Sequence, residues 1–284
     1  MYSVLRMILL FLMTLGAGIL ASLVGIGGGV IFVPIFNLFV GLPIEDAIGT
    51  SMFTIIFTAL SGSIYYAKEK RIDYKTGLLM EITTIPGAII GATTTELLPE
   101  TILKIIFFSF LFFSGFKLIR KKDTKKSSNF TFKRPRLKFL NIGWERKFID
   151  TQGKEWSYFI NIPVMLISGF LAGFISGLLG IGGGTLKVPL LTIILGVPVH
   201  IATATSTFMI LLTSTSGGIT HLYLGHVHLE IVLVAALGAI LGAQMGPRLN
   251  IKVSPRYLRK IVGAVLILVA ANMAYNTIQL LTTP

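Results

Sequence analysis

The stretch Gly25-Ile-Gly-Gly-Gly29, followed by Pro34, decides how this chain folds, because the chain repeats it as Gly180-Ile-Gly-Gly-Gly184, followed by Pro189. Both the glycine run and the proline recur at the same offset of 155 residues. At that offset, 18 of the 42 positions from 25 to 66 are identical. Agreement of this extent predicts two homologous halves.

Composition places both halves in a membrane. The chain has 284 residues, of which 53% are hydrophobic and 13% are charged, whereas a soluble domain has about 25% charged residues. The segment 120–158 holds 12 Lys/Arg and 4 Asp/Glu, which leaves 21 charges for the other 245 residues. Those residues are too poorly charged to cover a soluble domain. We therefore expect an all-α polytopic protein of the cell membrane (plasma or inner).

The apolar segments form two sets of five. They span 4–24, 30–40, 46–67, 74–95 and 101–119, and then 159–179, 185–195, 200–223, 228–246 and 256–281. The second member of each set is about half as long as a bilayer crossing requires and follows a glycine run, which predicts a half-helix. The expected division is a first transmembrane repeat over 1–119, a basic linker over 120–158 and a second repeat over 159–284.

The charges of the loops indicate that the repeats are inverted. An odd number of segments turns the second copy upside down in the membrane. The loop 68–75 has four Lys/Arg and its counterpart 225–228 has none, while 248–260 has five and its counterpart 96–104 has one. The positive-inside bias places the basic loops and the linker in the cytoplasm and both termini outside. The formal charge of +13 thus reports orientation, and we expect lipid rather than nucleic acid as the partner.

Each glycine run is a candidate binding site for an anion. Glycine is unfavourable within a helix, so three adjacent glycines predict unwound or closely packed backbone. At the start of a half-helix, the free N–H groups of such backbone favour an anion. Gly27, Gly28 and Gly29, with Gly182, Gly183 and Gly184, are therefore candidate substrate ligands. Close packing without any ligand is the alternative.

Two Thr-Ser pairs occur at equivalent positions of the halves, as Thr50-Ser51 and Thr205-Ser206. Their hydroxyls are candidates for hydrogen bonds to the oxygens of a solute. Helix capping and hydrogen bonding between helices are the ordinary roles of such residues in membranes.

Lys187 lies within an apolar half-helix, where its counterpart is Phe32. A cation at such depth marks a functional site. Lys187 is a candidate for neutralising an anionic solute; the alternatives are snorkelling to an interface or pairing with Glu81. Glu81 is a candidate either for proton coupling or for that structural pairing.

No residue pattern indicates an enzyme, a metal site or a cofactor. The chain has no cysteine, no zinc-protease motif and no phosphate-binding loop. Its histidines at 200, 221, 226 and 228 lack further ligands at metal-binding spacing, so a solvated loop is the simpler reading for the last two.

The doubled pattern Gly-Ile-Gly-Gly-Gly-x-x-x-Val-Pro, followed in each half by Gly-x-Pro and Ala-x-x-Thr-Ser, resembles the TauE/SafE (TSUP) family of sulfite exporter-like permeases. The resemblance covers both halves and excludes the linker. It implies transport of sulfite, thiosulfate or organosulfonates. It also implies that Gly25, Gly180, Pro34 and Pro189 belong to the family motif.

We therefore expect a permease that moves a small sulfur-containing anion by alternating access. An anion channel is one alternative. The other is a membrane subunit that passes a sulfur species to a partner enzyme. The residues do not specify the direction of transport, the coupling ion or the oligomeric state.

Overall fold

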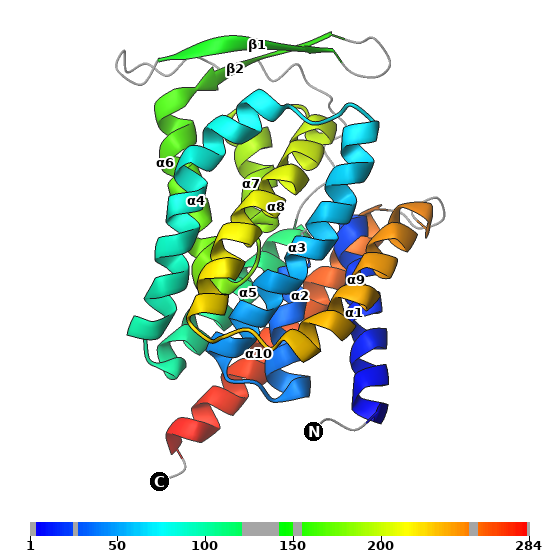
Figure 1. The fold of residues 1–284 in the computed structure, drawn as a ribbon, viewed down its shortest axis with the longest axis vertical. Coiled ribbons are helices and arrows are strands. Elements are labelled where there is room, and N and C mark those ends of the chain that lie inside the picture. The colour runs from blue at the N-terminus through cyan, green and yellow to red at the C-terminus, as the bar shows by residue number, and fades with distance from the viewer. Residues whose placement is uncertain (1–3, 25–27, 121–141, 150–154, 250–254, 283–284) are drawn as a thin grey trace.

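The computed structural model of the protein describes residues 4–24, 28–120, 142–149, 155–249 and 255–282 (Figure 1). The first half comprises α1 (Val4–Val24), α2 (Gly29–Pro34), η1 (Ile35–Val40), α3 (Ile44–Lys68), α4 (Tyr74–Leu97) and α5 (Glu100–Arg120). The second half comprises α6 (Ile162–Leu179), α7 (Gly184–Pro189), η3 (Leu190–Ile194), α8 (Val199–Tyr223), α9 (Leu229–Leu249) and α10 (Pro255–Thr282). A hairpin of β1 (Gly143–Ile149) and β2 (Glu155–Asn161) comes between them in the sequence.

The predicted fold class, an all-α polytopic membrane protein, is confirmed. Every predicted apolar segment coincides with a helix, or with a helix and its continuation, to within three residues at either end. Six of the described helices are long and apolar enough to cross a membrane. Helix α8 is as long as α3, with 25 residues, but its mean hydropathy is too low for it to be counted among the six because it is rich in serine and threonine. Helix α8 packs against α3, α4 and α6, so these polar side chains can face protein rather than lipid.

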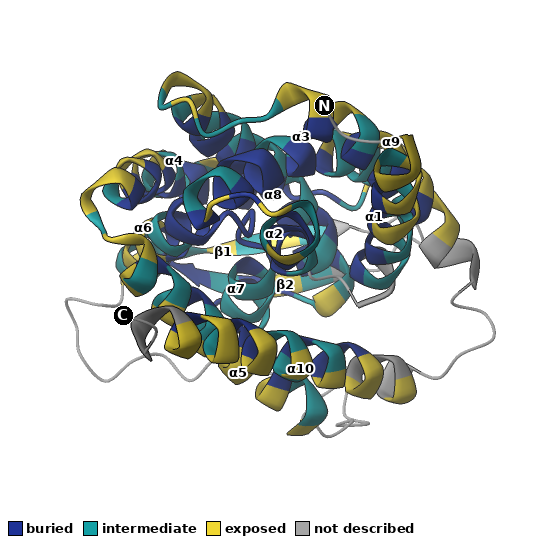
Figure 2. Cartoon of the chain, turned by 90° about the horizontal axis from the view of Figure 1, so that it is seen from below, coloured by how far each residue is buried: buried dark blue, intermediate teal, exposed yellow. Residues whose placement is uncertain are grey.

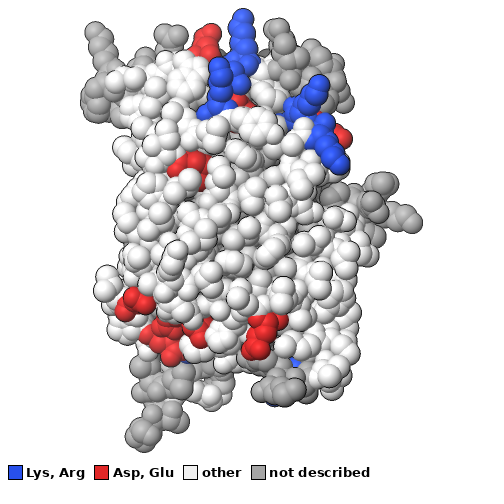
Figure 3. Space-filling view, in the orientation of Figure 1, with Lys and Arg blue, Asp and Glu red and all other residues white. Residues whose placement is uncertain are grey.

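An apolar surface surrounds the helical part of the molecule. Large side chains such as Phe113, Leu237 and Leu268 are more than half exposed. Exposed residues face outward from the helices seen from below in Figure 2. The charged groups visible in Figure 3 gather at the two ends and leave most of the middle uncharged. A contiguous apolar surface of this kind suits lipid rather than water.

Each half-helix changes from α to π winding at its proline. Pro34 ends α2 and Pro189 ends α7, and the π-helical segments η1 and η3 follow directly. Proline has no N–H for the carbonyl four residues earlier, and the lost bond is accommodated by a wider turn. With these continuations the half-helices span Gly29–Val40 and Gly184–Ile194, which is too short to cross a bilayer.

The halves are interlocked through helices that pair across them. Helix α1 packs along α9 and α6 packs along α4, while α3 pairs with its counterpart α8 and α5 with its counterpart α10. Glycines allow the backbones to touch: a Cβ at Gly177 would lie 2.0 Å from the carbonyl oxygen of Ala88, and a Cβ at Gly242 would lie 2.1 Å from that of Leu15. The helices of each half therefore pack mainly against helices of the other half.

The hairpin is the element that the sequence analysis missed. Its antiparallel register pairs Trp144 with Ile160, Arg146 with Tyr158 and Phe148 with Trp156. Five of the six residues in these pairs are apolar or aromatic, and all six lie on the same face of the hairpin, as in a sheet with one buried face. The hairpin covers the end of η3 and the start of α8, where Ile160 is fully buried.

Helix α6 consequently begins three residues later than the predicted 159. Residues 159–161 belong to β2, and the side chain of Asn161 then caps α6 by accepting a hydrogen bond from the backbone N–H of Val164 at 3.2 Å. The predicted cytoplasmic linker 120–158 lies partly outside the described residues; its described part forms this hairpin.

Candidate functional site

The two glycine runs meet at the centre of the bundle. A Cβ at Gly29 would lie 2.6 Å from the Cα atom of Ile181 and 2.7 Å from the carbonyl oxygen of Gly180. No side chain fits there, so Gly29 is needed for close packing of the two runs, whether or not its N–H group also contacts a ligand. Gly25 and Gly27 of the first run lie outside the described residues.

Both half-helices start from a glycine with a positive backbone angle. Gly28 precedes α2 with φ 81° and Gly183 precedes α7 with φ 79°, values that other residues rarely adopt. Their carbonyl oxygens accept from Phe32 N at 3.1 Å and from Lys187 N at 2.8 Å, respectively. The chain thus breaks between a long helix and each half-helix, as predicted.

A cavity of about 720 Å³ lies between the two halves and reaches the first of these breaks. It is lined by residues of α1, α3, α8 and α9, by Val188 of α7, by Gly28 of the first break and by Phe32 of α2. Lys68, which also lines it, ends α3 on the side of the hairpin (Figure 1). Its lining combines apolar side chains with hydroxyl groups, the amide of Gln244 and the ammonium of Lys68. A concave space of this kind is the usual form of a small-molecule site.

The two threonines of the Thr-Ser pairs hold the halves together. The hydroxyl oxygen of Thr50 accepts a hydrogen bond from the backbone N–H of His228 at 3.1 Å, and that of Thr205 accepts one from Asp73 N at 3.0 Å. Asp73 and His228 are themselves counterparts at the offset of 155. Each threonine therefore fixes the loop before a long helix of the opposite half.

The two serines of the pairs differ from each other. Ser51 Oγ donates to the carbonyl oxygen of Gly180 at 2.9 Å and so stabilises the second break. Ser206 lines the cavity, and its buried hydroxyl has no hydrogen-bond partner among the described residues. Of the four residues, Ser206 is thus the one with a hydroxyl available at the cavity.

Lys187 pairs with Glu81, which was one of the alternatives from the sequence. Its Nζ atom lies 2.7 Å from Glu81 Oε1, and it also donates to Thr213 Oγ1 and to the carbonyl oxygen of Met209. Thr213 donates to Glu81 Oε2 at 2.8 Å. Lys187 is fully buried and Glu81 is 2% exposed. Snorkelling to an interface is excluded by this burial.

His200 packs edge-on against Trp156 of the hairpin, with ring centroids 5.0 Å apart, whereas the other three histidines form local contacts at the opposite end of the bundle. The Nδ1 atoms of His221 and His226 are 3.3 Å apart, and His228 Nε2 lies 2.8 Å from Asp46 Oδ2. Among the described residues, no group of three or more His, Cys, Asp or Glu has a geometry that holds a metal ion.

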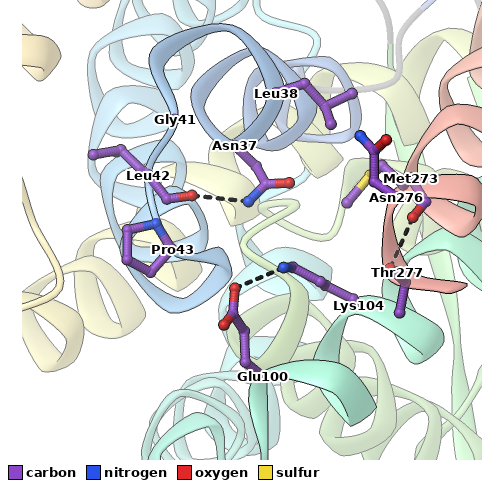
Figure 4. Close-up of a pocket in the computed structure, with 10 residues that line it drawn as sticks. All are labelled: Asn37, Leu38, Gly41, Leu42, Pro43, Glu100, Lys104, Met273, Asn276 and Thr277. Carbon is purple, nitrogen blue, oxygen red and sulfur yellow. Dashed lines mark hydrogen bonds and ion pairs between the residues drawn. The ribbon is translucent and has the colours of Figure 1, made fainter. Parts of the chain in front are cut away.

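A second, smaller pocket of about 390 Å³ lies at the end of η1, against α5 and α10 (Figure 4). Its charged groups satisfy each other, since Lys104 Nζ lies 2.7 Å from Glu100 Oε1. Asn37 Nδ2 donates to the carbonyl oxygen of Leu42 at 2.8 Å. The pocket is separate from the cavity, with which it shares no lining residue.

Asp73 joins the hairpin to the helices, a role that the sequence did not reveal. Its carboxylate accepts from Arg146 Nη2 at 3.0 Å, from Tyr158 Oη at 2.6 Å and from Thr76 Oγ1 at 2.6 Å. Burial alone raises the pKa of Asp73, but the hydrogen bonds from Arg146, Thr76 and Tyr158 outweigh it and hold that pKa below its usual value. The charge of Asp73 therefore stabilises the docked hairpin.

We expect Arg146→Ala to loosen the hairpin by about 2 kcal/mol, the scale of a hydrogen bond to a charged group. Hydrogen exchange of the strand amides measures this loosening, with Lys147→Ala, an exposed neighbour, as the matched control. Because the pKa of Asp73 is lowered by folding, its stabilisation is complete above the ordinary value of 3.8 and disappears as the pH falls through the folded-state pKa. Equal exchange in both variants would contradict this role.

These features define a polytopic membrane transporter: an apolar helical bundle, two half-helices that meet at glycine breaks, and a cavity between interlocked halves. The chain belongs to the TauE/SafE sulfite exporter family, whose description "Sulfite exporter TauE/SafE" matches residues 10–273. The predicted family is thereby confirmed.

Several curated relatives cover most of the chain. The probable membrane transporter protein YunE of Bacillus subtilis is 34% identical over 95% of this chain and 98% of its own length. A probable membrane transporter protein of Methanocaldococcus jannaschii is 28% identical over 88% of both chains. Sulfite exporter TauE/SafE family protein 6 of Arabidopsis thaliana is 24% identical over 92% of this chain and 77% of its own. No solved structure matches.

Proposed function

We propose that the protein is a permease for a small sulfur-containing anion, such as sulfite, thiosulfate or an organosulfonate, and that it works by alternating access. The observation that carries the proposal is the cavity of about 720 Å³, which lies between the halves and ends at the glycine break of a half-helix. The family, with relatives named as sulfite exporters, supports the class of substrate.

The proposed anion contacts in this conformation are the hydroxyl of Ser206 and the backbone N–H groups of the first turn of α2, around Gly28 and Gly29. N–H groups of a first helical turn have no partner within the helix and favour negative charge. Gly27 and the second run, Gly182 to Gly184, complete the proposed set. Ser51 supports it by holding the carbonyl oxygen of Gly180 at the second break, and Thr50 and Thr205 support it by fixing the loops before α9 and α4.

The proposed membrane orientation has the hairpin in the cytoplasm and both termini outside. Lys68, Lys117 and Arg120 lie in last turns of α3 and α5, whereas Glu45 and Glu230 lie in first turns of α3 and α9. Figure 1 shows the start of α1 and the end of α10 away from the hairpin. The reciprocal pairing of α1 with α9 and α4 with α6 supports inverted repeats that rock about a shared axis.

We expect Ser206→Ala to raise the KM for the transported anion about tenfold, because one lost hydrogen bond costs about 1 kcal/mol or somewhat more. The measurement is radiolabelled uptake into proteoliposomes across a panel of sulfite, thiosulfate, taurine and sulfoacetate. Ser63→Ala is the matched control, because that hydroxyl is also buried and without a partner among the described residues but does not line the cavity.

Three results bear on the alternatives. Flux that rises linearly without saturation would favour a channel over a carrier. Absence of flux for every anion in the panel, together with wild-type behaviour of a Gly28→Leu/Gly183→Leu variant, would overturn the permease. Co-purification of a sulfur-metabolising enzyme with an inactive protein would favour the relay subunit.

A further inference from the structure

The cavity at the first glycine break has a counterpart at the second glycine break, and this counterpart is closed. At the offset of 155 residues, the cavity residues Ala21, Phe32, Thr58 and Ala59 correspond to Ser176, Lys187, Thr213 and Ser214, respectively. In a transporter built from two related halves, the residues that line the cavity on one side of the membrane have equivalents in the opposite half. These equivalents line the cavity that opens to the other side of the membrane. Ser176, Lys187, Thr213 and Ser214, which we call the polar chamber, are thus the equivalents for the face opposite the hairpin.

The members of the polar chamber already lie together around the second glycine run. A Cβ built on Gly183 would lie 3.4 Å from Ser176 Oγ and 3.2 Å from Lys187 Cε, and one built on Gly182 would lie 3.1 Å from Ser214 Oγ. All four chamber side chains are 0% exposed. The chamber is therefore assembled but shut in this conformation.

The chamber contains hydroxyls without a structural use. The Oγ atoms of Ser176 and Ser214 have no hydrogen-bond partner among the described residues, although both are completely buried. A buried hydroxyl without a partner is unfavourable, so two beside one lysine require an explanation. Their counterparts Ala21 and Ala59 are apolar, which shows that the fold does not need hydroxyls at these positions.

The ion pair between Lys187 and Glu81 closes the chamber. Helix α6 has no titratable residue, and α7 has only Lys187. Helix α8 has none between His200 and His221, and α4 has only Glu81 between Lys75 and Glu96. Lys187 and Glu81 therefore balance each other alone, and moving either one leaves an uncompensated buried charge.

We propose that the polar chamber binds the transported anion in the opposite conformation, where Lys187 exchanges Glu81 for the anion and Glu81 takes up one proton. The inference rests on the proposed function, since it needs an anionic solute. The anion receives the Lys187 ammonium and the hydroxyls of Ser176 and Ser214. The proton comes from water at the open face and forms the O–H bond of the Glu81 carboxyl; no bond of the anion breaks.

The exchange of partners by Lys187 couples the movement of the proton to that of the anion. When the chamber closes and the cavity opens, the O–H bond of the Glu81 carboxyl breaks, the proton passes to water at the hairpin face, and Lys187 returns to the carboxylate. One proton therefore travels with each anion in the same direction. A monovalent anion would move without net charge, and a divalent anion would carry one negative charge.

The coupling is tested with ethanesulfonate or thiosulfate, anions that carry no proton at neutral pH, in proteoliposomes that contain a pH-sensitive dye. An imposed anion gradient should move about one proton per anion in the wild type. Glu81→Gln retains an acceptor for Lys187 and Thr213, and any anion that the folded variant still carries should move without protons, whereas Glu96→Gln on the same helix should behave like the wild type. Anion flux without proton movement in the wild type, or retained proton movement in Glu81→Gln, would overturn the coupling.

The chamber is tested separately by single-cysteine labelling, for which the natural chain provides a background without cysteine. Ala59→Cys should react with a membrane-impermeant thiol reagent from the hairpin face, and its counterpart Ser214→Cys only from the opposite face. Added anion should change the rate at Ser214→Cys at least several-fold. A Ser214→Cys that reacts from the hairpin face, or from neither face during active flux, rules the chamber out. Opposite-face labelling without flux of any anion would instead refute the substrate class.

Discussion

Lys187→Met alone is expected to destabilise the protein by about 3–5 kcal/mol, the cost of leaving the buried carboxylate of Glu81 without its partner. Glu81 is 2% exposed, and its other partner among the described residues is the uncharged Thr213. Water cannot reach the carboxylate to replace the lost ammonium. The yield of folded protein and its thermal unfolding midpoint in detergent should both fall sharply.

The double variant Lys187→Met/Glu81→Met should recover most of that stability, since replacing a buried ion pair by apolar side chains is often neutral or favourable. The recovery isolates the charge imbalance from the change in packing. Thr213→Val is the matched control, because it removes hydrogen bonds but no charge and should have a smaller effect. A double variant that is less stable than Lys187→Met would show that the pair itself is the main source of stability.

Gly177→Leu is expected to prevent α6 from packing along α4, with a loss that exceeds the 1–3 kcal/mol typical of overpacked cores. The Cβ of residue 177 would lie 2.0 Å from the carbonyl oxygen of Ala88 and 2.9 Å from the backbone nitrogen of Ala92. Backbone atoms of a helix cannot turn aside as a flexible side chain can, so the two axes must separate. We expect little monodisperse protein on size-exclusion chromatography.

Gly16→Leu provides the control for this substitution. A Cβ at Gly16 has nothing within 4 Å, and leucine is favoured over glycine in a helix by a few tenths of a kcal/mol or more. The same chemical change should therefore be neutral or mildly stabilising in α1. If Gly177→Leu and Gly16→Leu unfold at the same temperature, the close crossing of α4 and α6 is not needed for stability.

The hairpin shows why part of the structure escaped prediction. One face of its strands is mainly apolar, but the strands lie in a basic, serine-containing stretch whose composition indicates a solvated linker. The burial of Ile160 and Tyr158 depends on η3 and α8. No local pattern reveals such a surface, because it forms only when residues from distant segments fold together.

The breaks in the helices at the candidate site were predicted from the sequence, whereas the anion-binding roles of its residues stay predictions. Glycine runs at the start of short apolar segments correctly indicated two broken helices. The roles within the Thr-Ser pairs were not distinguishable, because Ser51 and Ser206 occupy equivalent positions after a threonine but have different surroundings: Ser51 bonds to Gly180, and Ser206 lines a cavity.

The sequence by itself determined the two homologous halves, the ten apolar segments and the breaks between them, because hydrophobic length and backbone freedom are properties of short, local runs of residues. The tertiary structure alone decided which groups meet. It brought Lys187 to Glu81 across 106 positions and Asp73 to Thr205 across 132. It also left the cavity open at the first glycine break and the polar chamber closed at the second. Contacts of that kind depend on how the helices pack, and packing is a property of the whole chain.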